Sequence, residues 1–293
     1  MKVSKQIACI IVTFNRVSIL QENLKFIQGQ EINPDIILVV NNGSTDGTIA
    51  FLQTQESWIY AVNLPVNVGY GAGLAAGIDY ARENWEIEYF WLMDDDSFPN
   101  SKVLSSLKSE VEGKRLDGIL GVTGFRLERG IPRPIRQADQ GISNADFVLV
   151  DNALLSASAV TQVGNFRTDL FMMCEDYEYC FRLRKYGLLV GVLNDPLMEV
   201  NRKHLGSQSN SKNLIWRGYY HSRNLMLILK DHFTLKGLIN YFYRQGKYLI
   251  HSMFFGVNRW SRTKYRLIGI WDGIWGISGK TLDPLSLKRV SRN

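Results

Sequence analysis

Three consecutive aspartates, Asp94, Asp95 and Asp96, directly follow the apolar run YFWLM at 89–93. Adjacent carboxylates repel one another, and a divalent cation such as Mg²⁺ or Mn²⁺, which prefers hard oxygen ligands, relieves that repulsion. Because alternate residues of an extended chain face the same side, we expect Asp94 and Asp96 to share a metal while Asp95 points elsewhere. A solvated acidic turn is the competing interpretation, but the position at a strand end favours a metal or substrate site.

Two further segments carry groups that could exchange protons or bind charge. Glu175 and Asp176 open the helical segment DYEYCFRLRKYG. They either cap its N-terminus or place Asp176 as a general base for an acceptor hydroxyl, and the residues leave both interpretations open. His204 lies in the polar stretch NRKHLGSQS. A lone histidine is more often structural than catalytic, but these surroundings argue against a core position and keep a metal or diphosphate contact open.

The glycine-rich segment NVGYGAGLAAG at 67–77 superficially matches a dinucleotide-binding fingerprint, through Gly71, Gly73 and Ala76. That fingerprint should follow the first strand of a domain, where this chain has Phe14 and Asn15 instead. The glycines therefore serve either close packing or the close approach of a nucleotide to the backbone. The sequence does not decide between these two.

The elements that must position these groups alternate between strand and helix in the first hundred residues. Continuous apolar runs at 8–14, 36–40, 59–64 and 89–93 indicate buried strands, and helical spacing appears between them. This order predicts a mainly parallel, Rossmann-like sheet flanked by helices, in an α/β fold. Ligands of such sheets bind at the carboxyl ends of the strands. The polar clusters at 13–16, 41–46 and 94–96 follow those ends.

The remaining chain mixes strands with a short helix over 176–185 and then becomes helical and amphipathic from about residue 213. We therefore expect a catalytic domain at 1–212, with a nucleotide-binding half at 1–100 and an acceptor-side half at 101–212. A C-terminal helical extension follows at 213–293.

Composition excludes several classes of protein. Of the 293 residues, 45% are hydrophobic and 21% are charged, which is enough for a sizeable core and argues against disorder. The apolar run near the N-terminus is too short for a signal peptide, and no stretch of about 18 apolar residues indicates a spanning helix. Three cysteines without a CxxC pair fit buried thiols in a reducing compartment rather than disulfides or a zinc site.

Charge is divided unevenly along the chain. Residues 1–200 carry a net charge of −8, whereas residues 201–293 contain 17 Lys and Arg, three Asp, no Glu and 14 aromatic residues. Aromatic and cationic residues on amphipathic helices favour peripheral attachment to a membrane. A helical subdomain that packs on the catalytic core and a nucleic-acid surface are the alternatives. We expect the membrane, and no nucleic acid, to be the partner.

Taken in order, these segments resemble the family-2 glycosyltransferases, which have the GT-A fold. The bacterial galactofuranosyltransferase and rhamnosyltransferase branch is the most similar. The resemblance covers about residues 1–210 and rests on IIVTFNR (10–16), VVNNGSTDGT (39–48), NVGYGAGLAAG (67–77), WLMDDDSFP (91–99), CEDYEYCFRLRKYG (174–187) and the His204 segment.

The resemblance implies a role for each matching residue. Asp94 and Asp96 would form the family's DxD element and hold Mn²⁺ or Mg²⁺ against a diphosphate, and His204 would complete the metal site. Asp176 would be the catalytic base. The nucleotide sugar would contact Thr13, Asn15, Arg16, Asn42, Asp46, Asn67, Gly69 and Asp95. Many members carry Asp where this chain has Asn41 and Asn42, which weakens any expectation about base recognition.

The implied reaction is inverting, metal-dependent hexosyl transfer from a nucleotide diphosphate sugar in cell-surface glycan synthesis. The first choice of donor is UDP-galactofuranose and the second is dTDP-rhamnose, with a lipid-linked or polysaccharide hydroxyl as acceptor, in the cytoplasm at the inner face of the membrane. A sugar nucleotidyltransferase is a rival, although its glycine-rich basic loop is missing after the first strand. A noncatalytic nucleotide-sugar-binding module is another, although the acidic set is intact. The linkage, physiological metal and oligomeric state stay open.

Overall fold

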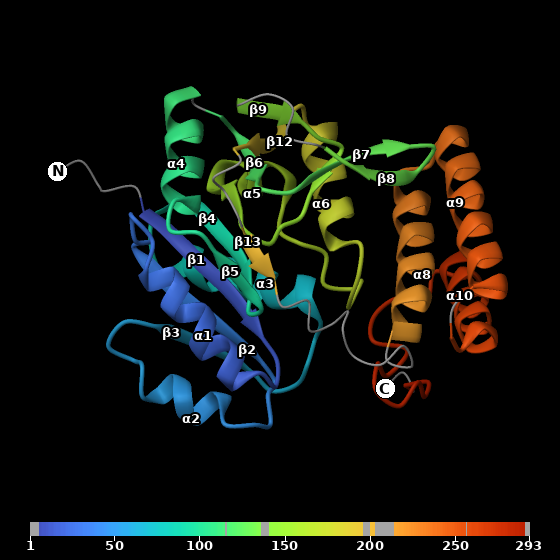
Figure 1. Ribbon diagram of the computed structural model, residues 1–293, viewed down its shortest axis with the longest axis horizontal. Coiled ribbons are helices and arrows are strands. Elements are labelled where there is room, and N and C mark those ends of the chain that lie inside the picture. The colour runs from blue at the N-terminus through green and yellow to red at the C-terminus, as the bar shows by residue number, and fades with distance from the viewer. Residues whose placement is uncertain are drawn as a thin grey trace.

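The structure is a computed structural model that describes residues 6–114, 116–135, 141–195, 200–202, 214–255 and 257–290 (Figure 1). Its N-terminal half alternates strand and helix as predicted. The elements are β1 (Gln6–Thr13), α1 (Val17–Gln28), β2 (Ile36–Asn42), α2 (Thr48–Gln53), β3 (Tyr60–Leu64), α3 (Tyr70–Asn84) and β4 (Ile87–Asp94).

The four strands of this half pair in parallel in the order β3-β2-β1-β4. Helices cover both faces, so the inner strands are apolar on both sides, and every residue of β2 is buried. On one face Leu74 and Ile78 of α3 pack against Ile10 of β1. On the other, Leu20 and Leu24 of α1 join a second core cluster. Because the strands are parallel, their carboxyl ends meet along one edge of the sheet.

The second half continues the same sheet with a change of direction. Its elements are β5 (Ser97–Pro99), α4 (Val103–Lys114), β6 (Gly118–Gly121), β7 (Gly124–Glu128), β8 (Ile131–Pro134), β9 (Gly141–Asn144), β10 (Phe147–Val148), β11 (Ala153–Ser156), α5 (Ala157–Val163), α6 (Glu175–Lys185), β12 (Leu189–Asn194) and β13 (Val200–Arg202). The eight-stranded sheet has the order β3-β2-β1-β4-β11-β6-β12-β9. Strands β11 and β9 run antiparallel to their neighbours. The predicted mainly parallel α/β sheet is therefore confirmed.

Three helices form the C-terminal part: α8 (Ile215–Asp231), α9 (Leu235–Phe254) and α10 (Arg259–Ile274). They lie together on one side of the molecule, beside the short hairpin β7–β8 (Figure 1). Helices α8 and α10 pack closely at glycines, since a Cβ on Gly269 would lie only 2.3 Å from the Tyr219 carbonyl oxygen. The prediction of helices in this segment is confirmed.

Candidate active site

A cleft of about 460 Å³ opens at the carboxyl ends of β1 and β4. It collects eight of the predicted nucleotide, metal and catalytic residues, including all three aspartates of the triplet. Its lining residues are Val12, Thr13, Phe14, Arg16, Asn42, Asn67, Tyr70, Asp94, Asp95, Asp96, Leu149, Val150, Asp151, Met172, Met173, Glu175, Asp176, Arg202, Trp216 and Arg217. The parallel sheet explains this convergence, because segments far apart in the sequence end at the same edge.

The middle aspartate of the triplet turns toward the first strand. Asp95 accepts hydrogen bonds from the Thr13 hydroxyl at 2.7 Å and from Arg16 Nη1 at 2.8 Å. The same guanidinium lies 3.6 Å from Asp96 Oδ2. Burial raises the pKa of Asp95, and the positive charge of Arg16 acts against that rise. Asp95 thus ties the two strand ends together.

Asp94 lies at the last position of β4 and is buried among other carboxylates. Burial raises its pKa well above the ordinary range, and the negative charge of Asp151 raises it further. Its backbone N–H donates to Asp151 Oδ1 at 3.1 Å. The Tyr70 hydroxyl is buried beside it and makes no hydrogen bond of regular geometry. A proton or a cation stabilises such a group, so positive charge fits this end of the cleft.

The donor set fits a hard divalent ion. Among the described residues no three His, Cys, Asp or Glu side chains converge as metal ligands. Mg²⁺ commonly uses only one or two carboxylates and takes its other ligands from water and substrate phosphates. Asp94 and Asp96 are carboxylates of this kind in one cleft. The predicted third ligand, His204, lies outside the described residues and stays a prediction.

Glu175 and Asp176 stand at the first turn of α6 and line the cleft. The residue that precedes the helix is Cys174, which makes no side-chain cap, and Asp176 instead accepts a hydrogen bond from the Val150 N–H at 3.4 Å. Burial and the charge of Glu175 raise the pKa of Asp176 well above its usual range. Burial raises the pKa of Glu175 to about 7, and its Oε2 has no hydrogen-bond partner among the described residues. Glu175 could therefore take up a proton near neutral pH, and the raised pKa of Asp176 makes it a stronger proton acceptor than an exposed aspartate.

The structure adds Asp151 to the site, a residue that the sequence analysis did not select. It accepts hydrogen bonds at 2.5 Å from the Ser97 hydroxyl and from Arg202 Nε. Since it also accepts from the Asp94 N–H, it fixes the end of β4. Asp151 follows the apolar residues FVLV, and the rule that selected Asp94, an acid directly after an apolar run, could have selected it too.

Helix α8 also contributes to the cleft, through Trp216 and Arg217. Burial lowers the pKa of Arg217, while the negative charge of Asp96 acts against that fall. Its Nε has no hydrogen-bond partner in the part of the chain that the structure describes. The neighbouring loop 171–174 contains three non-glycine residues with positive φ: Phe171, Met173 and Cys174. Asn224 of α8 holds this loop by donating to the carbonyl oxygens of Leu170, Met172 and Met173. No short sequence pattern indicated that the C-terminal helices shape the site.

The segment before α3 joins the cleft through two asparagines. Asn42 donates to the Gly69 carbonyl at 3.1 Å and accepts from the Val68 N–H, and Asn67 accepts from the Gly69 N–H. Gly69 itself is not among the lining residues. Its φ of 96° and a 1.9 Å approach of a Cβ to the Phe171 carbonyl oxygen require glycine here. Close packing therefore accounts for this glycine, and a role in donor binding stays a prediction.

Asn15 and Asp46 lie outside the lining of the cleft and hold its rim together. Asn15 Oδ1 accepts from the Thr45 N–H at 2.7 Å, and Asp46 Oδ2 accepts from the Val17 N–H at 3.1 Å, at the start of α1. The hydrogen bond from Thr48 helps to lower the pKa of Asp46. Contacts of these two residues with a nucleotide stay predictions.

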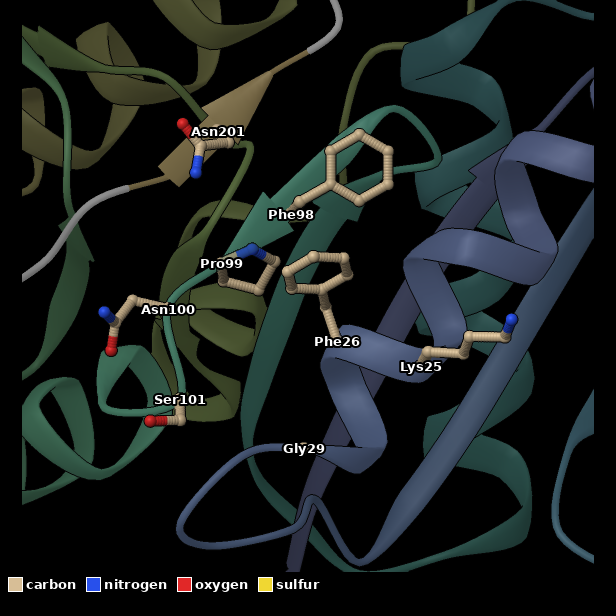
Figure 2. A pocket seen from close by; sticks show the side chains of 8 residues that line it. All are labelled: Lys25, Phe26, Gly29, Phe98, Pro99, Asn100, Ser101 and Asn201. Carbon is tan, nitrogen blue, oxygen red and sulfur yellow. The ribbon is translucent and has the colours of Figure 1, made fainter.

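A separate hollow of about 400 Å³ lies between α1 and β5 (Figure 2). Figure 2 shows Phe26, Phe98 and Pro99 on its apolar side, and the two phenyl rings lie 5.2 Å apart. It has no carboxylate and shares no lining residue with the acidic cleft. Lys25 is its single charged lining residue, so we assign the donor site to the acidic cleft.

A mixed α/β sheet with an acidic cleft at the carboxyl end of its first and fourth strands is the arrangement of a GT-A nucleotide-sugar transferase. The sequence model of glycosyl transferase family 2 matches residues 8–152, which contain most of β1, all of β2, β3 and β4, and the whole aspartate triplet. The chain belongs to this family and is a glycosyltransferase.

Known proteins agree with this assignment. The galactofuranosyltransferase GlfT1 of Mycolicibacterium smegmatis is 26% identical over 204 residues, which are 63% of this chain and 67% of that protein. The solved structure of Staphylococcus aureus TarS 1–349 has a TM-score of 0.60 at 14% identity, over 92% of this chain and 81% of TarS. The mannosyltransferase PcManGT from Pyrobaculum calidifontis, solved with GDP-Man and Mn²⁺, has a TM-score of 0.60 at 13% identity, over 92% and 87%. The two solved structures show the GT-A fold.

Proposed function

We propose that this protein is an inverting, metal-dependent galactofuranosyltransferase that uses UDP-galactofuranose and a lipid-linked or polysaccharide acceptor. The observation that carries the proposal is the convergence of Asp94 and Asp96 with Asp176 in one cleft. The first pair belongs to the end of β4 and the third residue to the start of α6. Two separate acidic groups allow one to serve the donor diphosphate and the other the acceptor hydroxyl.

In this proposal the base is Asp176. It takes the proton of the acceptor hydroxyl while that oxygen forms a bond to the anomeric carbon of the sugar. The bond from this carbon to the diphosphate breaks on the opposite face, so the nucleoside diphosphate leaves and the configuration inverts. The raised pKa of Asp176 supports this role, because a stronger base accepts the proton more readily near neutral pH.

In this proposal, residues at and after the carboxyl ends of the first strands bind the donor. Arg16 contacts the acidic triplet and supplies positive charge beside the diphosphate, and the Asn42–Asn67 pair lies where a nucleoside would enter. A Mn²⁺ or Mg²⁺ ion held by Asp94 and Asp96 would act as a Lewis acid toward the leaving diphosphate. PcManGT, of the same fold, was solved with Mn²⁺ and GDP-Man, which supports a divalent ion here.

The choice of galactofuranose rests on the GlfT1 relative, and a donor panel tests it. The purified protein with Mn²⁺ is given UDP-galactofuranose, dTDP-rhamnose, UDP-GlcNAc and GDP-mannose, and nucleoside diphosphate release is measured. We expect the fastest release from UDP-galactofuranose. Faster release from another donor would contradict the choice of galactofuranose but would still support a glycosyltransferase. Release of pyrophosphate would contradict the mechanism.

We also propose that the protein attaches to a membrane through its C-terminal helices. Among the described residues no helix is long and apolar enough to cross a bilayer. Helices α9 and α10 nevertheless expose large apolar side chains, including Phe254 at 67% and Trp260 at 76% of their surface. Aromatic residues beside Lys and Arg suit the headgroup region of a membrane. This surface supports the expected location on the inner face of the cytoplasmic membrane.

A further inference from the structure

A cavity of about 290 Å³, distinct from the acidic cleft and from the hollow in Figure 2, lies between α8, α9 and α10. We call it the second cavity. Its lining residues are Met173, Leu214, Ile215, Arg217, Gly218, His221, Tyr248, His251, Ser252, Arg262 and Arg266. Met173 and Arg217 also line the acidic cleft, so the two spaces adjoin at these side chains. A molecule in the second cavity therefore lies next to the site of sugar transfer.

The second cavity is cationic, and none of its described lining residues is a carboxylate. It contains Arg217, Arg262 and Arg266. The C-terminal part has only three acids, and each is engaged elsewhere: Asp231 with Arg167, Asp272 with Arg289 and Tyr219, and Asp283 with Ser286. Within the described part of the chain, no ion pair involves the three arginines of the cavity. Asp96 and Glu175 of the acidic cleft attract Arg217, whereas the positive charge of Arg262 and Arg266 is left for a ligand to compensate.

Burial makes this charge costly to leave without a partner. Burial lowers the pKa of Arg266 to about 10, and the nearby charges of Arg262 and Arg244 contribute. Arg266 Nη1 donates to Gln245 Oε1 at 3.0 Å, and its guanidinium lies over the Tyr248 ring at 4.9 Å. Arg217 Nε is buried and has no partner in the described structure. Fixed guanidinium groups with free N–H donors are suited to phosphate oxygens.

Exposed apolar side chains follow two lining residues of this cavity along the chain. Ser252 and His251 of the lining precede an exposed group that ends just before Arg262: Met253, Phe254, Phe255, Val257 and Trp260. A membrane in contact with this group would meet a chain segment that is flanked on both sides by lining residues of the cavity, Ser252 and Arg262. An anionic headgroup and an apolar chain on the same molecule would satisfy both surfaces.

We propose that the second cavity binds the phosphate or diphosphate of a lipid-linked acceptor, with the lipid chain along the exposed aromatic group and the acceptor sugar in the acidic cleft. This proposal rests on the proposed function and gives that enzyme its acceptor class. It also assigns Arg262 and Arg266 to acceptor binding and Arg217 to the boundary between acceptor and donor.

Binding of farnesyl diphosphate to the purified protein tests the proposal without knowledge of the acceptor sugar. Calorimetry is run with saturating UDP and Mn²⁺, so that the donor site is filled. We expect farnesyl diphosphate to bind, and farnesol and inorganic pyrophosphate to bind at least about tenfold more weakly. Competition by UDP would place the ligand in the donor site and overturn the proposal. Equally tight binding of inorganic pyrophosphate would show that the lipid chain adds nothing to binding, and would overturn the proposal that the ligand is a lipid.

Three variants locate the binding site. Arg262→Gln and Arg266→Gln should each weaken farnesyl diphosphate binding about tenfold, whereas the matched control Lys264→Gln, an exposed cation on the same helix, should change it less than twofold. The backbone N–H of Arg262 donates to the Asn258 carbonyl at 3.0 Å, which a substitution leaves in place, and its side chain makes no hydrogen bond within the described residues. We therefore expect Arg262→Gln to fold even if Arg266→Gln does not. Equal weakening by all three would indicate a general charge effect and overturn the site.

Vesicles of phosphatidylglycerol distinguish the acceptor headgroup from bulk lipid. We expect Arg262→Gln to bind these vesicles as the Lys264→Gln control does, because the cavity serves one acceptor molecule. A loss of vesicle binding confined to Arg262→Gln would assign the cavity to bulk lipid and overturn the proposal. The donor panel stands apart: turnover without farnesyl diphosphate binding refutes the cavity alone, and binding without turnover refutes the proposed function alone.

Discussion

At the scale of single residues, the acidic side chains of the site differ in whether they have a close cationic partner. Asp95 is paired with Arg16, and Asp151 with Arg202. Both have structural partners at close range, so they shape the cleft. Glu175 Oε2, by contrast, is buried without a hydrogen bond, and burial raises the pKa values of Asp94 and Asp176. Strongly perturbed carboxylates in a cleft are candidates for chemistry, because the fold leaves their charge for a substrate or ion to compensate.

Replacing the proposed base tests this division. We expect Asp176→Asn to lower kcat by about 10²–10⁴-fold, because the acceptor hydroxyl loses its proton acceptor. The KM for the donor should change little, because Asp176 acts on the acceptor. Single-turnover and steady-state transfer assays measure both quantities. Glu83→Gln, an exposed acid on α3, is the control. Unchanged turnover in Asp176→Asn would exclude this residue as the base.

The proposed metal ligands respond to metal concentration. We expect EDTA to abolish turnover and Mn²⁺ to restore it in the unmodified protein. In Asp96→Asn the Mn²⁺ concentration for half-maximal turnover should rise about tenfold or more, because a neutral amide is a weaker ligand for a hard cation. Glu83→Gln is again the control. An identical Mn²⁺ response in Asp96→Asn would remove Asp96 from the ligand set.

The pH dependence follows from the raised carboxylate pKa values. A base must be ionised, so kcat/KM should fall as the pH drops through the pKa of Asp176, which burial raises well above its usual range. The Glu175 charge also raises the pKa of Asp176. We therefore expect Glu175→Gln to move the acid limb of the profile to lower pH. An acid limb that stays in place, or moves to higher pH, would contradict this coupling.

At the scale of elements, the parallel half of the sheet could be predicted and the rest of the cleft could not. Apolar runs such as IILVV are buried on both faces, and their carboxyl ends carry the predicted polar clusters, so Thr13 and Asp94 meet as expected. The position of Asp151 in the cleft depends on β11, which runs antiparallel between β4 and β6. The position of Arg217 depends on how α8 packs against loop 170–174. Such tertiary contacts have no short-range signal in the sequence.

That packing makes Asn224 a sensitive position. Its side-chain amide donates to three backbone carbonyls of the loop that borders the cleft. We expect Asn224→Ala to lower the free energy of unfolding by about 1–3 kcal/mol, because buried carbonyls lose their donor. The KM for the acceptor should also rise as Met172 and Met173 lose their fixed positions. Urea unfolding and transfer kinetics measure the two effects.

The control for this prediction is Asn84→Ala at the exposed end of α3, where the side chain donates to one local carbonyl. We expect it to change the unfolding free energy by less than 1 kcal/mol. Equal destabilisation by the two substitutions would show that the loop does not depend on α8. Destabilisation by Asn224→Ala without any kinetic change would separate the loop from acceptor binding.

At the scale of the whole molecule, charge and apolar surface divide along the chain. Residues 1–200 are net acidic and hold the aspartates of the cleft, whereas residues 201–293 are strongly basic. Many of the large exposed apolar side chains lie on α9 and α10. These helices stand beside α8 at one side of the molecule (Figure 1). Repulsion by anionic lipid would turn the acidic sheet away from a membrane and the basic helices toward it.

The orientation can be tested on vesicles that contain phosphatidylglycerol. We expect the double variant Trp260→Ser/Trp271→Ser to reduce partitioning onto the vesicles about tenfold or more, since both indoles are more than half exposed on α10 and would lose their burial among the headgroups. Tyr186→Ser, an exposed aromatic beyond the end of α6, should leave partitioning unchanged. Added salt should weaken binding of all variants, because part of the attraction is between exposed charges. Equal losses in the indole and Tyr186 variants would mean that no single face meets the membrane, and full binding without both indoles would leave α10 exposed for another reason.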